Sequence, residues 1–319
     1  MAFRVSDATM FQNAVRSTRL NRYAMSELQN QLSSGKRVNS LSDDATAATE
    51  ILGLRRGVAQ IEQFDRNIEG ARASLEPVEG ALSSLTDVII RLRELAVSAD
   101  IETDQFQNIK PEVEQLFDEV LRIANTQVGG RFIFSGFDTD NIPFTKVGSF
   151  VAGVVDTSVP PEPYAQYNGD NGVRQLQIGE STTVNANVTG RVIFFGSSDG
   201  DDTPDGSNVD IFDVIRDFRN RLEDPGTVGA PADLTGDLDT ALSQVLQVRG
   251  TVGATLSRLD ITKAQLENLK VTLETQRSAI EDLDLIAAAT KLANIENTYQ
   301  ASLAVTARII QPSLLNFLG

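Results

Sequence analysis

The side chains that most often carry enzymatic chemistry are missing from this chain. Its 319 residues include no cysteine and no histidine. Thiol and imidazole nucleophiles, Ser-His-Asp triads and nearly every zinc site are therefore excluded. Without disulfides, packing or assembly has to supply the stability. Any catalytic or metal-binding role would have to rest on carboxylates, amines or backbone groups.

Two segments have the residue types of an ion or phosphate site without the spacing. Residues 33–37 read SSGKR, but a phosphate loop needs glycine at position 30, where this chain has Asn30. In a calcium loop that begins at Asp201, the last position needs a bidentate glutamate, and this chain has Phe212 there. We interpret the first segment as a turn between helices and the second as a solvated acidic turn. The acidic turn holds Asp199, Asp201, Asp202, Asp205 and Gly206.

Two further polar motifs have a structural explanation. The adjacent Asp43 and Asp44 could act as acid and base if one of them were desolvated, but on a polar linker they are typical helix caps. Asn187 begins a formal glycosylation sequon, which we interpret as strand sequence. We therefore predict no cofactor, no metal site and no enzymatic activity.

The charge of the chain excludes another class of function. Its net charge is −16, and no basic stripe offsets it, so binding to nucleic acid is not expected. No stretch approaches the roughly 18 apolar residues of a membrane span, and the first residues lack the apolar core of a Sec signal. If the protein is secreted, we expect a route that cleaves no signal peptide.

The elements that remain are helical, and the apolar stripes at the two ends are their most informative feature. Apolar residues recur there at steps of three and four, which places them on one face of a helix. Residues 1–40 hold six Lys/Arg and two Asp/Glu, so this end is nearly free of acid. Because chain ends usually fray, these stripes predict contact with each other or with another chain. The predicted assembly residues are Phe11, Val15, Met25, Leu28, Leu32, Leu292, Ile295, Tyr299, Leu303, Ile310, Leu314, Leu315 and Phe317.

Between the ends, helical and strand-like segments alternate. Heptad spacing over 75–92 and an apolar seam over 238–283 predict helices packed in a bundle or coiled coil. With no proline from 232 to 311, we expect one helix of some 70 residues, roughly 100 Å long. Glycine- and proline-rich sequence over 131–235, with net charge −9, predicts a β-containing insert that includes the run RVIFFG. Residues 211–222 predict a short helix near its end.

These elements predict an α+β fold: an elongated, hairpin-like rod of long helices with a β-rich domain inserted in the middle. The expected domains are a terminal assembly domain (1–45 and 285–319), a helical rod domain (46–130 and 236–284) and the inserted domain (131–235). Gly35, Asp43 and Asp44 are expected in the turn between the first two, as a helix C-cap and an N-cap.

The segment 32–48, LSSGKRVNSLSDDATAA, closely resembles the link between the outer terminal and rod domains of bacterial flagellins and their hook-associated relatives. The last 28 residues are similar to the C-terminal helix of the same superfamily. Three features resemble the hook–filament junction (FlgL) type rather than flagellin itself. These are the opening RVSDATMFQNAV, the segment GGRFIFSGF with the hairpin that follows it, and the ending Asn-Phe-Leu-Gly.

This resemblance implies a structural protein of the bacterial flagellum, located outside the cell at the hook–filament junction. Its implied partners are copies of itself in a ring, the other junction protein on the hook side, flagellin on the filament side and a cytosolic chaperone before type III export. We expect Leu303→Asp or Leu314→Asp to leave the central fold intact and to abolish incorporation. Flagellin itself is the nearest alternative function, and a ligand-binding or adhesive axial protein is a more distant one.

Overall fold

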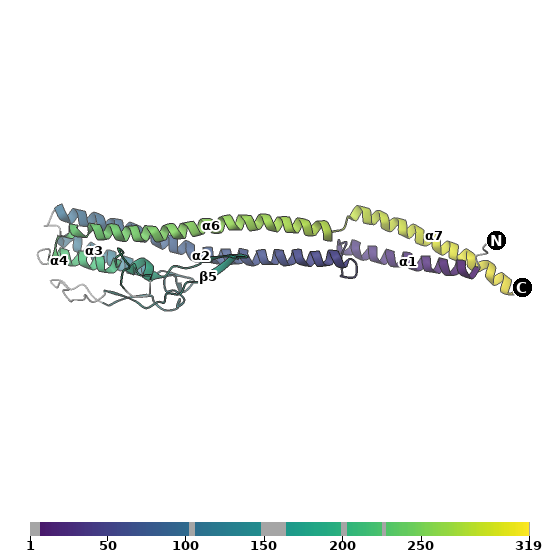
Figure 1. Cartoon of the computed structure of the whole chain (residues 1–319), viewed down its shortest axis with the longest axis horizontal. Helices are drawn as coiled ribbons and strands as arrows, with labels where there is room; N and C mark the ends of the chain where they lie inside the picture. The colour runs from purple at the N-terminus through teal and green to yellow at the C-terminus, as the bar shows by residue number, and fades with distance from the viewer. Residues whose placement is uncertain (1–6, 102–105, 148–163, 199–202, 225–227, 319) are drawn as a thin grey trace. The chain divides into compact units, whose positions relative to one another are not determined.

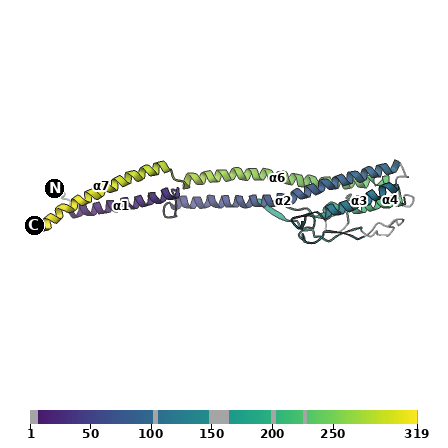
Figure 2. The ribbon, with the colours of Figure 1, turned by 180° about the vertical axis from the view of Figure 1, so that it is seen from behind.

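The computed structural model describes residues 7–101, 106–147, 164–198, 203–224 and 228–318, with the backbone alone at 7, 8, 10, 11, 100, 101 and 308–318. The chain divides into two compact units. We call residues 1–60 with 267–319 the terminal unit and residues 61–266 the central unit. Helices dominate both, as Figures 1 and 2 show. No described helix is long and apolar enough to cross a membrane.

In the terminal unit, helix α1 (Asp7–Ser34) runs antiparallel to helix α7 (Leu285–Leu318) (Figure 1). The unit also contains the first turns of α2 (Ala45–Ile101) and the last turns of α6 (Thr235–Glu281). The Nη2 atom of Arg55 on α2 lies 2.6 Å from a carboxylate oxygen of Glu281 on α6. The prediction that N- and C-terminal helices pair is therefore confirmed.

In the central unit, α2 and α6 are antiparallel neighbours joined by ion pairs. Arg72 pairs with Asp260 at 2.9 Å, and Glu79 pairs with Arg249 at 2.9 Å, so partner numbers fall on α6 as they rise on α2. The predicted heptad positions on α2 form the buried seam: Leu75, Val78, Leu82, Leu85, Ile89 and Leu92 are each at most 1% exposed. Leu269, which the sequence placed in the seam of α6, lies in the part of α6 that belongs to the terminal unit and is instead 48% exposed.

Helices α3 (Phe106–Ala124) and α4 (Ile211–Glu223) also belong to the central unit. Short antiparallel hairpins connect them: β1 (Gln127–Val128) with β2 (Arg131–Phe132), β3 (Phe144–Lys146) with β4 (Ala165–Tyr167), and β5 (Gln175–Gly179) with β6 (Thr182–Asn185). The β5–β6 hairpin lies on α2, where Asn67 donates to the carbonyl of Gln177 at 2.6 Å. A β-containing middle of the chain is thereby confirmed.

An aromatic core holds these hairpins against the helices. The ring of Phe144 lies 5.0 Å from that of Phe194 and 5.6 Å from that of Phe212, mostly in edge or tilted geometry. The run over 191–195, which was expected to be strand, is a helical turn, η2 (Arg191–Phe195). Short apolar runs do not distinguish strand from helix, and this turn places Phe194 and Phe195 in the core.

The prediction of a single helix of some 70 residues toward the C-terminal end is wrong. Helix α6 ends at Glu281 and α7 begins at Leu285, with residues 282–284 between them outside the helix. Proline is not needed for this break. The side chain of Asp284 accepts hydrogen bonds from the amides of Ile286 and Ala287, both at 3.0 Å, so it caps a new helix.

Candidate assembly surface and its junction

The predicted apolar stripes lie on α1 and α7, two helices that contact each other. The Nδ2 atom of Asn21 lies 3.4 Å from the Oγ atom of Ser302, which identifies the facing sides of the two helices. Among the predicted residues, Leu28 is buried at 6% exposure, whereas Leu303 is 44% exposed. Half-buried members of the predicted set are Val15, Met25, Leu32, Leu292, Ile295 and Tyr299. The side chains of Phe11, Ile310, Leu314, Leu315 and Phe317 lie outside the described residues.

The opposite side of α1 carries large apolar side chains that the sequence prediction missed. Leu20 is 60% exposed and Tyr23 is 75% exposed, and they border a shallow hollow of about 410 Å³. Its other lining residues are Gln12, Val15, Arg16 and Arg19. On α7, Ile286 is 82% exposed and Val305 is 54% exposed. The signal was available, because Arg16, Leu20 and Tyr23 also recur at helical spacing.

Two non-helical segments, one after α1 and one before α7, are hydrogen-bonded to each other. Helix α1 ends at Ser34 and helix α6 ends at Glu281, and backbone hydrogen bonds join the segments that follow them. The amide of Arg37 donates to the carbonyl of Glu281 at 2.7 Å, and the amide of Leu283 donates to the carbonyl of Gly35 at 3.0 Å. An isolated bridge pairs Lys36 with Asp282. We call residues 35–44 with 281–284 the junction.

Residues predicted for the turn lie in this junction. Gly35 follows the last residue of α1 with φ of +70°, a conformation in which glycine avoids the steric cost of a side chain. Asp44 precedes α2 and accepts a hydrogen bond from the amide of Ala47 at 3.0 Å, which is the geometry of an N-cap. Asp43 instead holds the loop, because its Oδ2 atom accepts from the amides of Asn39 and Ser40, both at 2.9 Å.

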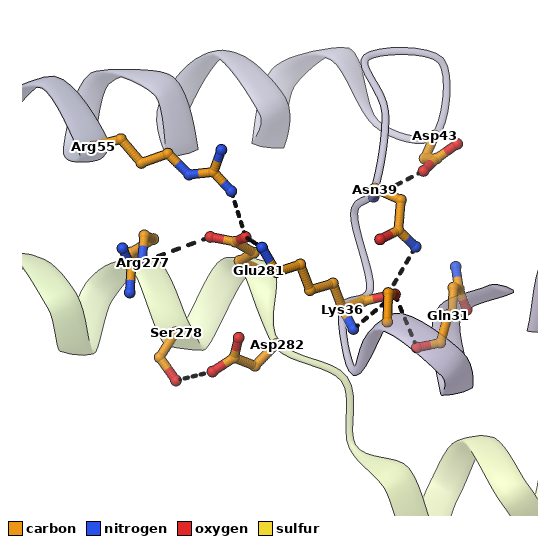
Figure 3. Close-up of polar contacts among 10 residues, drawn as sticks. Gln31, Lys36, Asn39, Asp43, Arg55, Arg277, Ser278, Glu281 and Asp282 are labelled. Carbon is orange, nitrogen blue, oxygen red and sulfur yellow. Dashed lines mark hydrogen bonds and ion pairs between the residues drawn. The ribbon is translucent and has the colours of Figure 1, made fainter.

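Glu281 is the electrostatic centre of the junction (Figure 3). Its side chain is only 4% exposed, and its carboxylate lies 2.5 Å from the Nζ atom of Lys36 and 2.6 Å from Arg55. Arg277, one turn back on α6, lies 3.6 Å away. Burial alone would raise the pKa of Glu281, but the hydrogen bonds from Lys36 and Arg55 outweigh it and hold this pKa below its ordinary value. The carboxylate therefore stays ionised and joins the loop that follows α1 to α2 and α6.

The described residues offer helix surfaces rather than a reacting centre. Among them, no group of three or more acidic side chains is placed to hold a metal ion. Both ends of the Asn187 side-chain amide are used internally, since its oxygen accepts from the Arg174 amide at 2.7 Å and its nitrogen donates to the Gly172 carbonyl at 2.8 Å. Asp199, Asp201 and Asp202 of the acidic turn lie outside the described residues.

The helices at both ends of the chain match two protein-family regions. Residues 5–139 match the bacterial flagellin N-terminal helical region, and residues 235–318 match the bacterial flagellin C-terminal helical region. The chain belongs to the bacterial flagellin family. The terminal helix pair and the α2–α6 pair of this flagellin-family protein thus both lie within matched regions, and the β-containing middle lies mostly between them.

Curated relatives of the chain include two kinds of flagellar protein. The flagellar hook-associated protein 3 of Escherichia coli is 27% identical over 318 residues, which cover 94% of each chain. The hook-associated protein 3 of Salmonella typhimurium is 26% identical over 88% of this chain and 89% of its own length. The flagellin of Bacillus subtilis is 27% identical over 91% of each chain.

Solved structures show the same fold. A putative flagellar hook-associated protein from Vibrio parahaemolyticus has a TM-score of 0.61 at 21% identity and covers 75% of this chain and all of its own. The flagellar junction protein FlgL from Legionella pneumophila has a TM-score of 0.56 at 19% identity, covering 74% of this chain and all of its own. The resemblance noted from the sequence is therefore confirmed at the level of family and fold.

Proposed function

We propose that this flagellin-family protein is a structural subunit of the bacterial flagellum at the hook–filament junction, where copies form a ring. Near-complete alignment with hook-associated protein 3 from two bacteria supports this assignment. The chain acts outside the cell, after type III export, and has no enzymatic role. Its other partners are the second junction protein on the hook side, flagellin on the filament side and a cytosolic chaperone before export.

The observation that carries assembly is the exposed apolar surface of the terminal helices. Tyr23 on α1 and Ile286 on α7 are among the most exposed large apolar side chains of the described residues. Full burial of such a side chain contributes about 1.5–3 kcal/mol. A few contacts of this size between neighbouring subunits therefore stabilise a ring. Exposed apolar patches of this kind mark interaction sites on soluble proteins.

The test places charge on that surface. The double variant Leu20→Asp/Tyr23→Asp is expected to keep its helix content and the unfolding of the central unit, and to lose incorporation into flagella. Leu303→Asp on α7 is expected to do the same. Asn13→Asp/Ser17→Asp adds the same charge at exposed polar positions of α1 and serves as the matched control. Filament assembly by Leu20→Asp/Tyr23→Asp at the level of the control would contradict the proposal.

Flagellin is the second candidate function, because the Bacillus subtilis flagellin is as similar as the junction proteins. Gold-labelled antibody on intact flagella separates the two functions. A label at one point of each flagellum is expected for a junction subunit, and a label along the whole filament would assign the chain as flagellin. A strain that lacks the gene is expected to keep hooks and to release unpolymerised flagellin into the medium.

A further inference from the structure

A cavity of about 400 Å³ lies in the central unit, where α2 meets the hairpins. Its polar lining includes Ser74 on α2, Arg131 on the β1–β2 hairpin, and Arg174 and Asn187, which flank the β5–β6 hairpin, together with Thr139. Phe132 and Phe137 are among its apolar lining residues. Concave sites of this size, in which polar groups and apolar side chains converge, are typical binding sites.

Two uncompensated positive charges distinguish this cavity from its surroundings. The central unit contains 33 Asp/Glu and only 16 Lys/Arg, so most of its basic side chains pair with a carboxylate. Within the described part of the chain, neither Arg131 nor Arg174 has an ion-pair partner. Among the described residues, the Arg174 guanidinium donates a hydrogen bond to the neutral hydroxyl of Ser74 at 2.6 Å and to no other side chain. A strongly acidic unit thus leaves two guanidinium groups free of carboxylates at one cavity.

Both arginines are carried on well-supported backbone. The amide of Arg174 donates to the Asn187 side chain at 2.7 Å, and its carbonyl accepts from the amide of Ala186 at 2.7 Å. Arg131 follows the Gly129-Gly130 turn, whose φ angles of +59° and +81° suit a tight hairpin. Little ordering of this backbone is therefore needed when a ligand binds.

The exposed aromatic ring beside them is also held in place. Phe137 is 63% exposed, and a Cβ atom at Gly172 would lie 2.1 Å from its ring, so the ring packs directly on the Gly172 backbone. The amide of Phe137 donates to the Asp170 side chain at 2.7 Å. Val128 on β1 adds a further exposed apolar surface at 44% exposure. A ligand for this cavity therefore combines an anionic group with an apolar one.

We propose that this cavity binds an acidic segment of a second copy of the chain, which inserts a carboxylate between Arg131 and Arg174 and an adjacent apolar side chain against Phe137. This inference rests on the proposed ring. In a ring, the central unit of each neighbouring copy, with its excess of Asp and Glu side chains, is held close to this cavity. The local concentration of carboxylates at the cavity is therefore high. Arginine pairs carboxylates in bidentate geometry, and charge complementarity of this kind sets the register between partners.

Photo-crosslinking in assembled flagella identifies the occupant. A photoreactive phenylalanine analogue at position 137 of the full chain is expected to give a covalent dimer of this chain. The second peptide in the crosslink is expected to contain Asp or Glu. The analogue at Ile142, which is 53% exposed and does not line the cavity, is the matched control. A crosslink from position 137 to flagellin or to another flagellar protein, or a dimer yield no higher than the control, overturns the proposal.

Charge reversal tests the two arginines. Arg131→Glu/Arg174→Glu is expected to lower the crosslinked dimer by about tenfold or more, because breaking a charge pair across an interface costs several kcal/mol. Arg66→Glu/Arg258→Glu changes the charge of the central unit equally at exposed positions outside the cavity, and is expected to keep the dimer. Arg131→Lys/Arg174→Lys retains the charges and is expected to restore part of it. Circular dichroism and thermal unfolding of each variant establish that it is folded.

The outcomes separate this inference from the proposed function. If the unmodified chain fails to restore filaments in a strain that lacks its own junction protein, the proposed function is wrong. If the unmodified chain restores filaments and Arg131→Glu/Arg174→Glu gives the same dimer yield, the cavity inference alone is wrong.

Discussion

Helix α3 and helix α7 differ in how completely their apolar faces are covered. Seven of the 19 residues of α3 are buried, among them Val113 and Phe117 at 0% exposure. Over the described side chains of α7, residues 285–307, Ala288 alone is buried. Helix α3 packs against α4 and the hairpins, whereas α7 has α1 as its main partner. An amphipathic sequence therefore predicts that a face will be covered, but the number of neighbours decides how completely one chain covers it.

The largest expected effect of a substitution on stability is in the central unit, which contains α3. Phe144→Ala removes a ring that contacts four other aromatic rings, and we expect a loss of about 3–5 kcal/mol in the free energy of unfolding. Phe137→Ala, at an exposed ring, is expected to cost about 0.5 kcal/mol or less. Urea unfolding of the full chain, followed by near-ultraviolet circular dichroism, measures both. Equal costs would show that the aromatic core does not hold the central unit.

The stability of the terminal unit, which contains α7, is expected to depend on the carboxylate of Glu281. Glu281→Gln leaves Lys36 and Arg55 without their charged partner, and both are nearly half exposed, so water compensates part of the loss. We expect a cost of about 1–3 kcal/mol that is confined to the terminal unit. Hydrogen exchange is therefore expected to speed up in α7 and to stay unchanged in α3. Glu296→Gln, at an exposed acid of α7, is the control and is expected to change neither helix.

Acid is expected to act on the two units in opposite directions. The folded pKa of Glu281 lies below its ordinary value of 4.5, so its stabilising effect is complete above that value and is lost as the pH falls through the folded pKa. Asp210, the N-cap of α4, has its pKa raised well above the ordinary value of 3.8 by burial and by Asp213. Its ionisation costs stability at neutral pH, and that cost disappears as the pH falls through its raised pKa.

Hydrogen exchange measured from pH 7 to pH 3 tests this difference. Amides of α7 are expected to lose protection as the pH falls below 4.5 and through the lowered pKa of Glu281. Amides of α4 are expected to keep or gain protection as Asp210 protonates. In the Glu281→Gln variant the acid response of α7 is expected to become smaller. Simultaneous loss of protection in α4 and α7 at one pH would contradict the separate roles of the two carboxyl groups.

The smallest expected effect concerns the helix starts at the junction. Asp284→Ala removes the cap of α7 and is expected to cost about 1 kcal/mol. Asp44→Ala removes the cap of α2 and is expected to destabilise the start of that helix. Asn294→Ala, in the exposed middle of α7, is expected to cost less than either. Helix content by far-ultraviolet circular dichroism and local hydrogen exchange measure the changes. A cost for Asn294→Ala as large as that for Asp284→Ala would remove capping as the explanation.

The sequence predicted most accurately the parts where spacing alone decides the structure. Heptad positions from Leu75 to Leu92 are buried as expected, because a strict apolar repeat has one possible buried face. The family resemblance at 32–48 located the junction loop, where Gly35 and Asp44 have the expected local geometry. The break at 282–284 was missed because neither glycine nor proline marks it. Asp284 before the apolar Leu285 was the available signal.

The rest could not be predicted because it depends on contacts between distant residues. The helical turn Arg191–Phe195 packs Phe194 against the rings of Phe134 and of Phe212 on α4. The sequence of the turn alone does not specify these contacts. Leu303 follows the same helical period as its half-buried neighbours, yet it is 44% exposed because α1 covers only part of α7. The predicted assembly residues therefore stay a prediction, to which the exposed Leu20 and Tyr23 now add a second face.

The hydrogen bonds of the junction also set an order of events in folding. Gly35 and Leu283 are separated by nearly 250 residues, as are Arg37 and Glu281, and contacts of such long sequence separation carry a large loop-closure cost. A chain that enters its final environment from its N-terminus cannot close the junction until almost all of it has arrived. In such a chain, helix α1 can pack against α7 only after the C-terminal residues have arrived. The arrival of α7 therefore determines when the fold of α1 is completed.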